Sequence, residues 1–393
     1  MFFTESVQIM LSNFSFDDSN LPALNVLRQE VRDFLEEERQ RGTVLRSPEG
    51  WDRFDPAFSK RLGARGWLGM TLPKEYGGHE RTALERYVVT EELITAGAPL
   101  RAHWLTDRQI GPGILHYGTE AQKRLYLPRI AAGELYFCAG LSEPDSGSDL
   151  ASIRTRATRV DGGWRINGSK IWTSGAHRVH MINLFARSSG TPEDRQQGVT
   201  QFLTDLNSPG ITVRPIINMH GDHDFNQVFF DDVFVPDDAV LGTVGNAWSQ
   251  VSTELAHERS GCERWLLSYG LLTRLITQVG STPEPHVAER IGHLVAHLWT
   301  MHRMSFSIAA MLEEGKTPNV EAALVKDLGT HYDLEVPVVA RQLIPPHVRA
   351  SLEEDAPFNA MFNRVLDYSP SFTIRGGTRE ILRGIIARGL GLR

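Results

Sequence analysis

Cysteine is nearly absent from this chain of 393 residues, in which Cys138 and Cys262 are the only two. Two cysteines cannot build a disulfide framework, so the sequence predicts a reducing compartment. Long apolar runs are absent too, and none approaches the roughly 18 residues of a membrane-spanning helix. The first 20 residues lack the basic start and continuous apolar core of a signal peptide. We therefore expect a cytoplasmic protein that has no membrane-spanning segment.

A concentrated basic surface is also missing. The chain carries 41 basic and 48 acidic residues in a mixed distribution, and its net charge is -7. Nucleic-acid phosphates require a concentrated basic surface, so we do not expect nucleic acid as the main partner. With 41% hydrophobic and 23% charged residues, the composition is that of an ordinary globular protein.

The short motifs of several enzyme classes are missing as well. The sequence contains no Rossmann G-x-G-x-x-G after a strand, no P-loop, no G-x-S-x-G elbow and no H-E-x-x-H zinc motif. His293 and His297 stand four residues apart on a predicted helix and could share a metal ion. No carboxylate or thiolate accompanies them at matching spacing, so we expect ordinary helix histidines and no metal site.

Hydrophobic periodicity divides the chain into three structured zones. In LNVLRQEVRDFLEEERQR, residues 24–41, apolar residues recur every three or four positions and predict an amphipathic helix. The period changes to two in the middle zone, where Asp161-Gly162-Gly163 and Asn167-Gly168 are typical of hairpin turns between short antiparallel strands. The predicted domains are a tail over residues 1–20, a helical domain over 21–135, a β domain over 136–242 and a helical domain over 243–393.

One acidic residue, Glu258, interrupts an apolar face in the C-terminal zone. A predicted helix carries this face on Trp248, Val251, Leu255, Cys262, Trp265 and Tyr269. At about 100° per residue, Glu258 projects into the middle of the face, whereas Glu263 lies outside it and is expected in solvent. Two interpretations of Glu258 stay open here: a buried ion pair, for example with Arg259, or a general base whose pKa is raised by burial.

Four segments in order resemble the acyl-CoA dehydrogenase family of flavoenzymes. They are GWLGMTLPKEYGG (66–78), GLSEPDSGSDL (140–150), INGSKIWTSGA (166–176) and IRGGTREILRGIIARGLGL (374–392). The resemblance spans nearly the whole chain. It implies an α+β fold with an N-terminal helical domain, a middle antiparallel β-barrel domain and a C-terminal four-helix bundle. It also implies FAD, held between the last two domains and across a subunit interface.

The same resemblance assigns residues to the cofactor. Leu141 and Ser142 would face the polar rim of the flavin, Trp172 would pack against its ring, and Ser174 would lie near N5. Small residues let the backbone approach a ligand closely, which fits a pyrophosphate or substrate at Gly147 and Ser148. The expected cofactor-binding residues are Leu141, Ser142, Gly147, Ser148, Trp172, Ser174, Thr378 and Glu380. Ser148 and Arg259 are also expected at the substrate.

The resemblance implies α,β-dehydrogenation of an acyl-CoA thioester, in which a carboxylate removes the α-proton while the β-hydrogen leaves as hydride to flavin N5. Many members carry that carboxylate in a Tyr-Glu-Gly-Thr motif, but this chain has Arg375-Gly376-Gly377-Thr378. A minority of the family places its base on the first long helix of the C-terminal domain, which corresponds to Glu258. We therefore expect Glu258 as the base and the backbone N–H of Gly376 as a donor to the thioester carbonyl.

The family residues that reach the FAD of a neighbouring subunit are not recognisable after Tyr269. In this respect the chain resembles actinobacterial members that act on steroid side chains or other bulky acyl groups, some of them as α2β2 assemblies. The expected partners are an acyl-CoA or acyl-carrier thioester, a homotetramer or α2β2 heterotetramer, and an electron-transfer flavoprotein. Two alternatives remain: a flavin-dependent monooxygenase or oxidase of the same fold, and a non-catalytic subunit of a heteromeric dehydrogenase.

Overall fold

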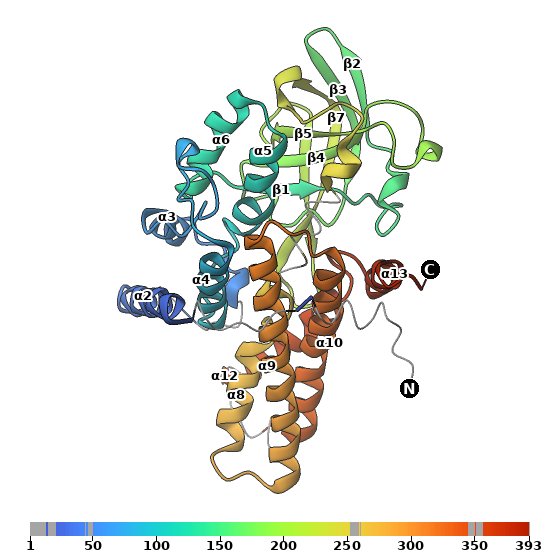
Figure 1. The fold of residues 1–393 in the computed structure, drawn as a ribbon. Helices are drawn as coiled ribbons and strands as arrows, with labels where there is room; N and C mark the ends of the chain where they lie inside the picture. The colour runs from blue at the N-terminus through green and yellow to red at the C-terminus, as the bar shows by residue number, and fades with distance from the viewer. Residues whose placement is uncertain are drawn as a thin grey trace. The chain divides into compact units, whose positions relative to one another are not determined.

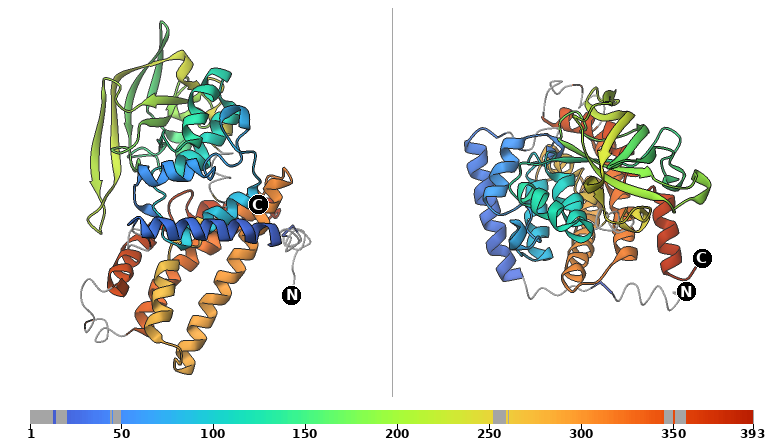
Figure 2. Two further views of the ribbon diagram at one scale, coloured as in Figure 1. Left: turned by 90° about the vertical axis from the view of Figure 1, so that its left-hand side faces the viewer. Right: turned by 90° about the horizontal axis from the view of Figure 1, so that it is seen from above.

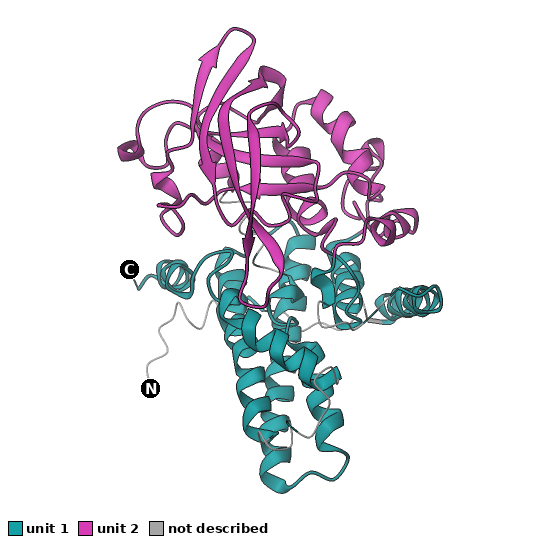
Figure 3. Cartoon of the chain, turned by 180° about the vertical axis from the view of Figure 1, so that it is seen from behind, with its two compact units in different colours: residues 1–53, 82–100, 258–393 teal, residues 54–81, 101–257 magenta. Residues whose placement is uncertain are grey.

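The structure is a computed structural model, and it describes residues 13–14, 21–43, 45, 50–251, 259, 261–344, 350 and 357–392. The chain forms two compact units, coloured separately in Figure 3: unit 1 comprises residues 1–53, 82–100 and 258–393, and unit 2 comprises residues 54–81 and 101–257. Among the described residues, no helix combines the length and apolar character needed to cross a membrane.

Unit 2 is built on one sheet of eight strands. They are β1 (Phe137–Gly140), β2 (Arg156–Val160), β3 (Gly163–Lys170), β4 (Met181–Arg187), β5 (Val199–Asp205), β6 (Ile211–Ile217), β7 (His223–Pro236) and β8 (Val240–Leu241). The pairing order is β6-β7-β3-β2-β4-β5-β8, with β1 beside β4. Most pairs are antiparallel as predicted, while β1–β4 and β2–β4 are parallel. The predicted middle β domain is therefore confirmed, with two parallel pairs that the hairpin pattern did not indicate.

Strand β5 is buried on both faces, because its successive side chains pack into two different apolar clusters. Phe202 packs in the sheet core with Trp164 and Ile182. The next residue, Leu203, packs with Leu127 of α6 (Glu120–Ala131) in a second apolar cluster. Because successive side chains of a strand point to opposite faces, the strand needs apolar residues at both positions. The remaining helical elements of unit 2 include α3 (Pro56–Ala64), a π-helix (Thr106–Ile110) and α5 (Gly111–Tyr117).

The two predicted hairpin turns have different outcomes. Asp161 and Gly162 connect β2 to β3, and Gly162 has the positive φ of 70° that such a tight turn requires. Asn167-Gly168 lies inside β3, so the prediction of a turn there was wrong. The register with β7 shifts between Ile166 and Gly168, and Gly168 has φ 145°. Asn167 therefore faces two residues of β7, Asp231 and Asp232, so the dipeptide lies opposite a β-bulge whose extra residue belongs to β7.

Unit 1 is helical. In Figure 1, α8 (Tyr269–Val279), α9 (Pro285–Glu313), α10 (Asn319–Leu343) and α12 (Pro357–Phe372) form the predicted C-terminal bundle. Their shared apolar core includes Leu272, Leu294, Val336 and Phe362. The other helices of the unit are α2 (Leu21–Gln40), α4 (Ala83–Thr95) and α13 (Arg379–Gly389), and the left view of Figure 2 shows α2 as one long blue helix. The predicted apolar face of α2 is confirmed, since Leu24, Leu27, Val31, Phe34 and Leu35 are all buried.

The long apolar face predicted around Glu258 is interrupted in the structure. A short 3₁₀ helix spans Cys262–Arg264, and α8 begins only at Tyr269. Glu263, expected in solvent, is 3% exposed, so that expectation was wrong. A 3₁₀ helix has three residues per turn, and an extrapolation at 3.6 residues per turn therefore assigns its side chains to the wrong face. Glu258 itself lies outside the described residues.

A buried histidine in unit 2 predicts a loss of stability in acid. His103 is 5% exposed, and its Nδ1 lies 2.7 Å from Ser59 Oγ. Burial lowers the pKa of His103 to about 4. Between pH 6.5 and 4 the unfolded chain therefore binds a proton that the folded chain does not, so stability falls as the pH falls. At the acid end of this window, the neutral His103 lowers the free energy of unfolding by about 3 kcal/mol relative to pH 7.

The measurement is urea unfolding of the wild-type chain and of His103→Gln at pH 7 and pH 4.5. We expect the difference in unfolding free energy between the two pH values to be smaller in the variant. His286→Gln, a change at an exposed position of α9, is the matched control. An identical pH dependence in all three proteins would contradict the assignment.

Candidate functional site

A buried ion pair anchors the loop that follows β1. Lys170, at the end of β3, is fully buried, and its Nζ lies 2.7 Å from Oε1 of Glu143, which is 8% exposed. The same ammonium group donates to the carbonyl of Leu141 at 3.0 Å. Glu143 also accepts the backbone N–H groups of Arg154 at 2.7 Å and Thr155 at 2.9 Å. The Ser-Glu-Pro corner, residues 142–144, is thus held against β3 by Lys170, for which the sequence predicted no role.

The protonation of this pair follows from its surroundings. Burial lowers the pKa of Lys170 to about 8, although the Glu143 carboxylate opposes that shift. Burial alone would raise the pKa of Glu143, but the Lys170 charge and the hydrogen bonds from Thr155 and Arg154 hold that pKa below its ordinary value. Both groups are therefore charged at neutral pH, and each compensates the other in a dry environment.

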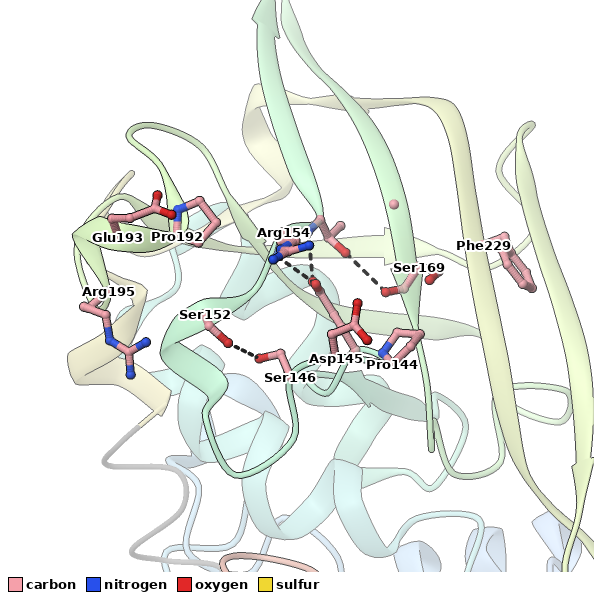
Figure 4. Close-up of a pocket in the computed structure, with 13 residues that line it drawn as sticks. Pro144, Asp145, Ser146, Ser152, Arg154, Ser169, Pro192, Glu193, Arg195 and Phe229 are labelled. Atoms are coloured by element: carbon pink, nitrogen blue, oxygen red, sulfur yellow. Dashed lines mark hydrogen bonds between the residues drawn. The ribbon is translucent and has the colours of Figure 1, made fainter.

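A pocket of about 810 Å³ opens beside this corner (Figure 4). Asp145 and Ser146 line it from the loop after β1, Arg154 from the approach to β2, and Glu193 and Arg195 from the segment between β4 and β5. The lining carries both signs of charge and also includes the apolar side chains of Pro144, Pro192 and Phe229.

The residue Trp172 combines two uncommon properties. It has a positive φ of 57°, a strained conformation for a bulky residue, and it is 56% exposed. The preceding residue, Ile171, donates its N–H to the carbonyl of Ser142 at 2.9 Å, and the following residue, Thr173, donates to the carbonyl of Asn226 at 2.9 Å. These bonds fix the backbone on both sides of the strained residue. They also bring the Ser142 and Trp172 segments together, as the sequence analysis expected of one site.

Buried polar atoms without partners lie directly after Trp172. Among the described residues, Thr173 Oγ1 and His177 Nε2 are buried and accept or donate no hydrogen bond. The His177 ring stacks on His223 with 3.6 Å between ring centroids, and burial together with the neighbouring imidazole lowers the pKa of His177 to about 4. A neutral imidazole and a hydroxyl group therefore each leave one buried polar atom without a hydrogen-bond partner in this part of unit 2.

The other predicted residues of unit 2 are accessible. Leu141, Ser142 and Ser174 are half-buried, and Gly147 and Ser148 are exposed. A Cβ atom on Gly147 would meet no other atom of the chain within 4 Å. Packing within the chain therefore does not require glycine at this position, which leaves open space for a ligand.

In unit 1, two buried cations hold the Gly-Gly corner before α13. Arg259 Nε donates to the carbonyl of Gly376 at 3.1 Å, and Lys326 Nζ donates to the carbonyl of Gly377 at 2.9 Å. The exposed fraction is 9% for Arg259 and zero for Lys326. Both glycines have positive φ, 65° for Gly376 and 101° for Gly377. The corner thus depends on glycine for its conformation and on the two cations for its position.

The start of α13 is fixed from α10 as well. Asp327, next to Lys326, accepts from Arg379 Nε at 2.7 Å and from Arg383 Nε at 3.3 Å. Thr378 is the N-cap of α13, and Glu380 lies exposed in its first turn. Burial at Lys326 was not evident from the sequence, because its spacing on α10 could equally be that of a surface residue.

The predicted site residues therefore fall into two groups. Leu141 to Ser174 belong to unit 2, and Arg259 with Gly376 to Glu380 belong to unit 1. Hydrogen bonds join the Ser142 and Trp172 segments in unit 2. In unit 1 they join Arg259 to Gly376. Glu258, the predicted base, is outside the described residues.

Two solved structures of similar fold match nearly the whole chain. The "Tcur3481-Tcur3483 steroid ACAD" matches with a TM-score of 0.83 and 28% identity, over 95% of this chain and 98% of that one. The ChsE4-ChsE5 complex from Mycobacterium tuberculosis matches with a TM-score of 0.81 and 28% identity, over 95% of this chain and 98% of that one.

The relatives found by sequence similarity include proteins named acyl-CoA dehydrogenases. The acyl-CoA dehydrogenase FadE34 of Mycobacterium tuberculosis is 34% identical over 335 residues, which cover 84% of this chain and 45% of that protein. The acyl-CoA dehydrogenase IpdE1 of the same organism is 32% identical over 346 residues, 86% of this chain and 87% of the relative. The family models for the N-terminal, middle and C-terminal domains of acyl-CoA dehydrogenases match residues 22–134, 138–233 and 248–391 in order. The chain therefore belongs to the acyl-CoA dehydrogenase family.

Proposed function

We propose that the protein is a FAD-dependent dehydrogenase that converts an acyl thioester to its trans-2-enoyl thioester. Membership of the acyl-CoA dehydrogenase family supports the reaction class. Trp172 is the observation that carries the proposal for the cofactor. A strained and exposed indole, held beside the Ser142 loop, offers a flat apolar surface of the kind that an aromatic ring system stacks on.

The residues around Trp172 fit FAD. Leu141, Ser142 and Ser174, which are half-buried, would contact the polar rim of the flavin. The open space at Gly147 and the exposed Ser148 hydroxyl suit the pyrophosphate or the substrate. Thr378 and Glu380 would complete the cofactor contacts from unit 1. When bound, FAD supplies the acceptor for the hydride.

The chain itself would perform the proton chemistry. Glu258 would remove the α-proton, for which a carboxylate needs an elevated pKa in a dry site. The backbone N–H of Gly376 would donate to the thioester carbonyl and stabilise the negative charge that develops on its oxygen. Arg259 and Lys326 would act as positioning residues, because they donate to the carbonyls of Gly376 and Gly377 in the same corner.

The substrate would carry a bulky or branched acyl group, such as a steroid side chain. Gly376 replaces the carboxylate that many family members carry at this position, so the α-carbon has more room around it. Relatives described as steroid enzymes support this substrate class. The ChsE4-ChsE5 pair likewise supports an assembly of two chain types, with a homotetramer as the alternative. The reduced cofactor would pass its electrons to an electron-transfer flavoprotein.

The first experiment is the visible absorption spectrum of the purified chain, followed by anaerobic addition of acyl-CoA thioesters of increasing bulk. Flavin bands that bleach with a bulky or branched thioester would support the proposal. Bleaching only with short straight-chain thioesters would contradict the substrate class. A flavin-free dimer that acquires flavin on mixing with a second chain type would support the heteromeric assembly, whereas a flavin-replete tetramer would exclude it.

A pair of substitutions at Trp172 tests its role as the flavin platform. Trp172→Ala and Trp172→Gly both remove the ring, and we expect each to weaken FAD binding by about tenfold or more. Only glycine adopts the positive φ without strain, so the flavin-free Gly variant should be the more stable of the two by about 1 kcal/mol. Flavin titration and thermal unfolding provide the two measurements.

Trp299→Ala is the control for this pair, because Trp299 is 66% exposed on α9 and outside the proposed site. It should leave flavin binding unchanged. If both Trp172 variants bound FAD like the wild type, the indole would have no contact with the flavin.

A further inference from the structure

Two histidines and a glutamate meet on one flank of the helical bundle. His293 and His297 are one turn apart on α9, and Glu335 comes from α10. One potential ligand atom from each residue lies within 4.8 Å of the others. The two imidazole rings have centroids 4.2 Å apart, and His297 Nδ1 lies 3.6 Å from Glu335 Oε2. The sequence predicted no metal site because no carboxylate accompanied the histidines at matching spacing, but the fold supplies a carboxylate from another helix.

Packing of the bundle fixes the position of Glu335 opposite the histidines. Two polar pairs connect α9 and α10 along this flank: His297 with Glu335, and Arg290 with Gln342 at 3.2 Å. Residue numbers rise along α9 as they fall along α10, so the two helices are antiparallel. The pairs are seven residues apart on each helix, which is two helical turns. The two helices therefore keep one register over this distance, and the three side chains meet because of that register.

Apolar contacts hold the register from the inside. Leu294 of α9 and Val336 and Val339 of α10 belong to the buried core of the bundle. Each lies within four residues of a member of the His-His-Glu group. The backbone that carries the group is therefore anchored to the core of the bundle, while the three side chains lie nearer the surface.

The three side chains have the chemistry of a transition-metal site. Two imidazoles and one carboxylate are the protein ligands of several zinc sites in which water takes the fourth position. Imidazole favours Zn²⁺, Cu²⁺ and Ni²⁺ over hard cations such as Mg²⁺ and Ca²⁺. Zinc bonds of roughly 2.0–2.2 Å need the ligand atoms closer together than they are here. The side chains of His297 and Glu335 are 47% and 21% exposed, so rotamer changes can bring them closer.

We propose that His293, His297 and Glu335 bind one transition-metal ion, with Zn²⁺ as the expected species, and that this ion connects α9 to α10. The site lies in unit 1, on residues to which the dehydrogenase reaction assigns no role. It is therefore independent of the proposed function. Its effect would be on the stability of the bundle, because an ion that binds only the folded chain raises the unfolding temperature.

The test uses the full chain, freed of any histidine tag and treated with a chelator. Zn²⁺ is titrated by calorimetry or by competition with a chromogenic chelator. We expect one site per chain, and a dissociation constant that rises by about tenfold or more in His293→Ala, in His297→Ala and in Glu335→Gln. His286→Ala, a change at an exposed histidine of the same helix, is the matched control and should bind as the wild type does.

Thermal unfolding gives a second measurement. Zn²⁺ should raise the unfolding temperature of the wild type and of His286→Ala, and should do so less in the three site variants. Loss of binding in the histidine variants but not in Glu335→Gln would overturn the bridge between helices, since the ion would then be held by α9 alone. Unchanged Zn²⁺ binding in all three variants, or no binding by the wild type, would overturn the site itself.

Discussion

Glu258→Gln is expected to lower the rate of flavin reduction by an acyl thioester by about 10²- to 10⁴-fold, which is the usual contribution of a general base. The amide has nearly the shape of the carboxylate but cannot accept the α-proton. Bound flavin should stay at the wild-type level, because the proposed cofactor contacts lie on other residues. The measurement is anaerobic stopped-flow absorbance at the flavin bands, together with the flavin content of the purified variant.

A matched control for this variant lies five residues further along the chain. Glu263→Gln replaces a carboxylate of unit 1 that is buried in the structure, and Glu263 has no role in the proposed reaction. We expect that variant to keep the wild-type rate of flavin reduction. If turnover survived in Glu258→Gln, the base would be another group. If both variants lost flavin, Glu258 would be acting on the fold rather than on the α-proton.

The same preparations separate the two alternative functions from dehydrogenation. A monooxygenase or oxidase of this fold would consume oxygen rapidly and productively after reduction, whereas a dehydrogenase would pass its electrons to an artificial acceptor. A non-catalytic subunit would show no flavin reduction with any thioester, and Glu258→Gln would then change nothing. Each outcome points to a different function of the chain.

The fold was predictable because burial imposes its period on the sequence. The apolar residues of α2 recur at helical spacing since one face of the helix is buried, and burial alternates along β7 from Asn226 to Phe230 for the same reason. The failures are local. Asn167-Gly168 has the composition of a turn but lies within β3, opposite a bulge in β7. The 3₁₀ helix at Cys262–Arg264 interrupts an apolar face that helical periodicity predicted to be continuous. Amino-acid composition does not distinguish an Asn-Gly turn from an Asn-Gly pair within a strand, and hydrophobic periodicity does not show where a helix is interrupted.

The candidate site was predictable to the extent that it consists of short segments. Ser142 and Trp172 lie in two motifs 30 residues apart, and a backbone hydrogen bond between Ile171 and Ser142 joins those motifs. The side chains that hold such segments in place were not predictable. Lys326 reaches Gly377 from another helix, and no spacing in the sequence records a contact over 51 residues. The carboxylate partner of His293 and His297 was missed for the same reason.

Lys170→Met is expected to lower the free energy of unfolding by about 3–5 kcal/mol, the usual effect of removing one partner from a buried ion pair. Methionine fills a similar volume but leaves the buried charge of Glu143 without compensation. The carbonyl of Leu141 also loses its donor, so the loop at the proposed flavin rim is no longer held. We therefore expect flavin to be lost together with stability. Urea unfolding and flavin titration provide the measurements.

A double variant separates the two effects. Glu143→Gln added to Lys170→Met removes the uncompensated charge, and we expect most of the lost stability to return. Flavin binding should stay weak, because the Leu141 carbonyl still lacks its donor. Recovery of both quantities would show that the ion pair serves only the fold of unit 2. Recovery of stability alone would show that Lys170 positions the loop after β1 for its ligand, a role that is separate from its contribution to stability.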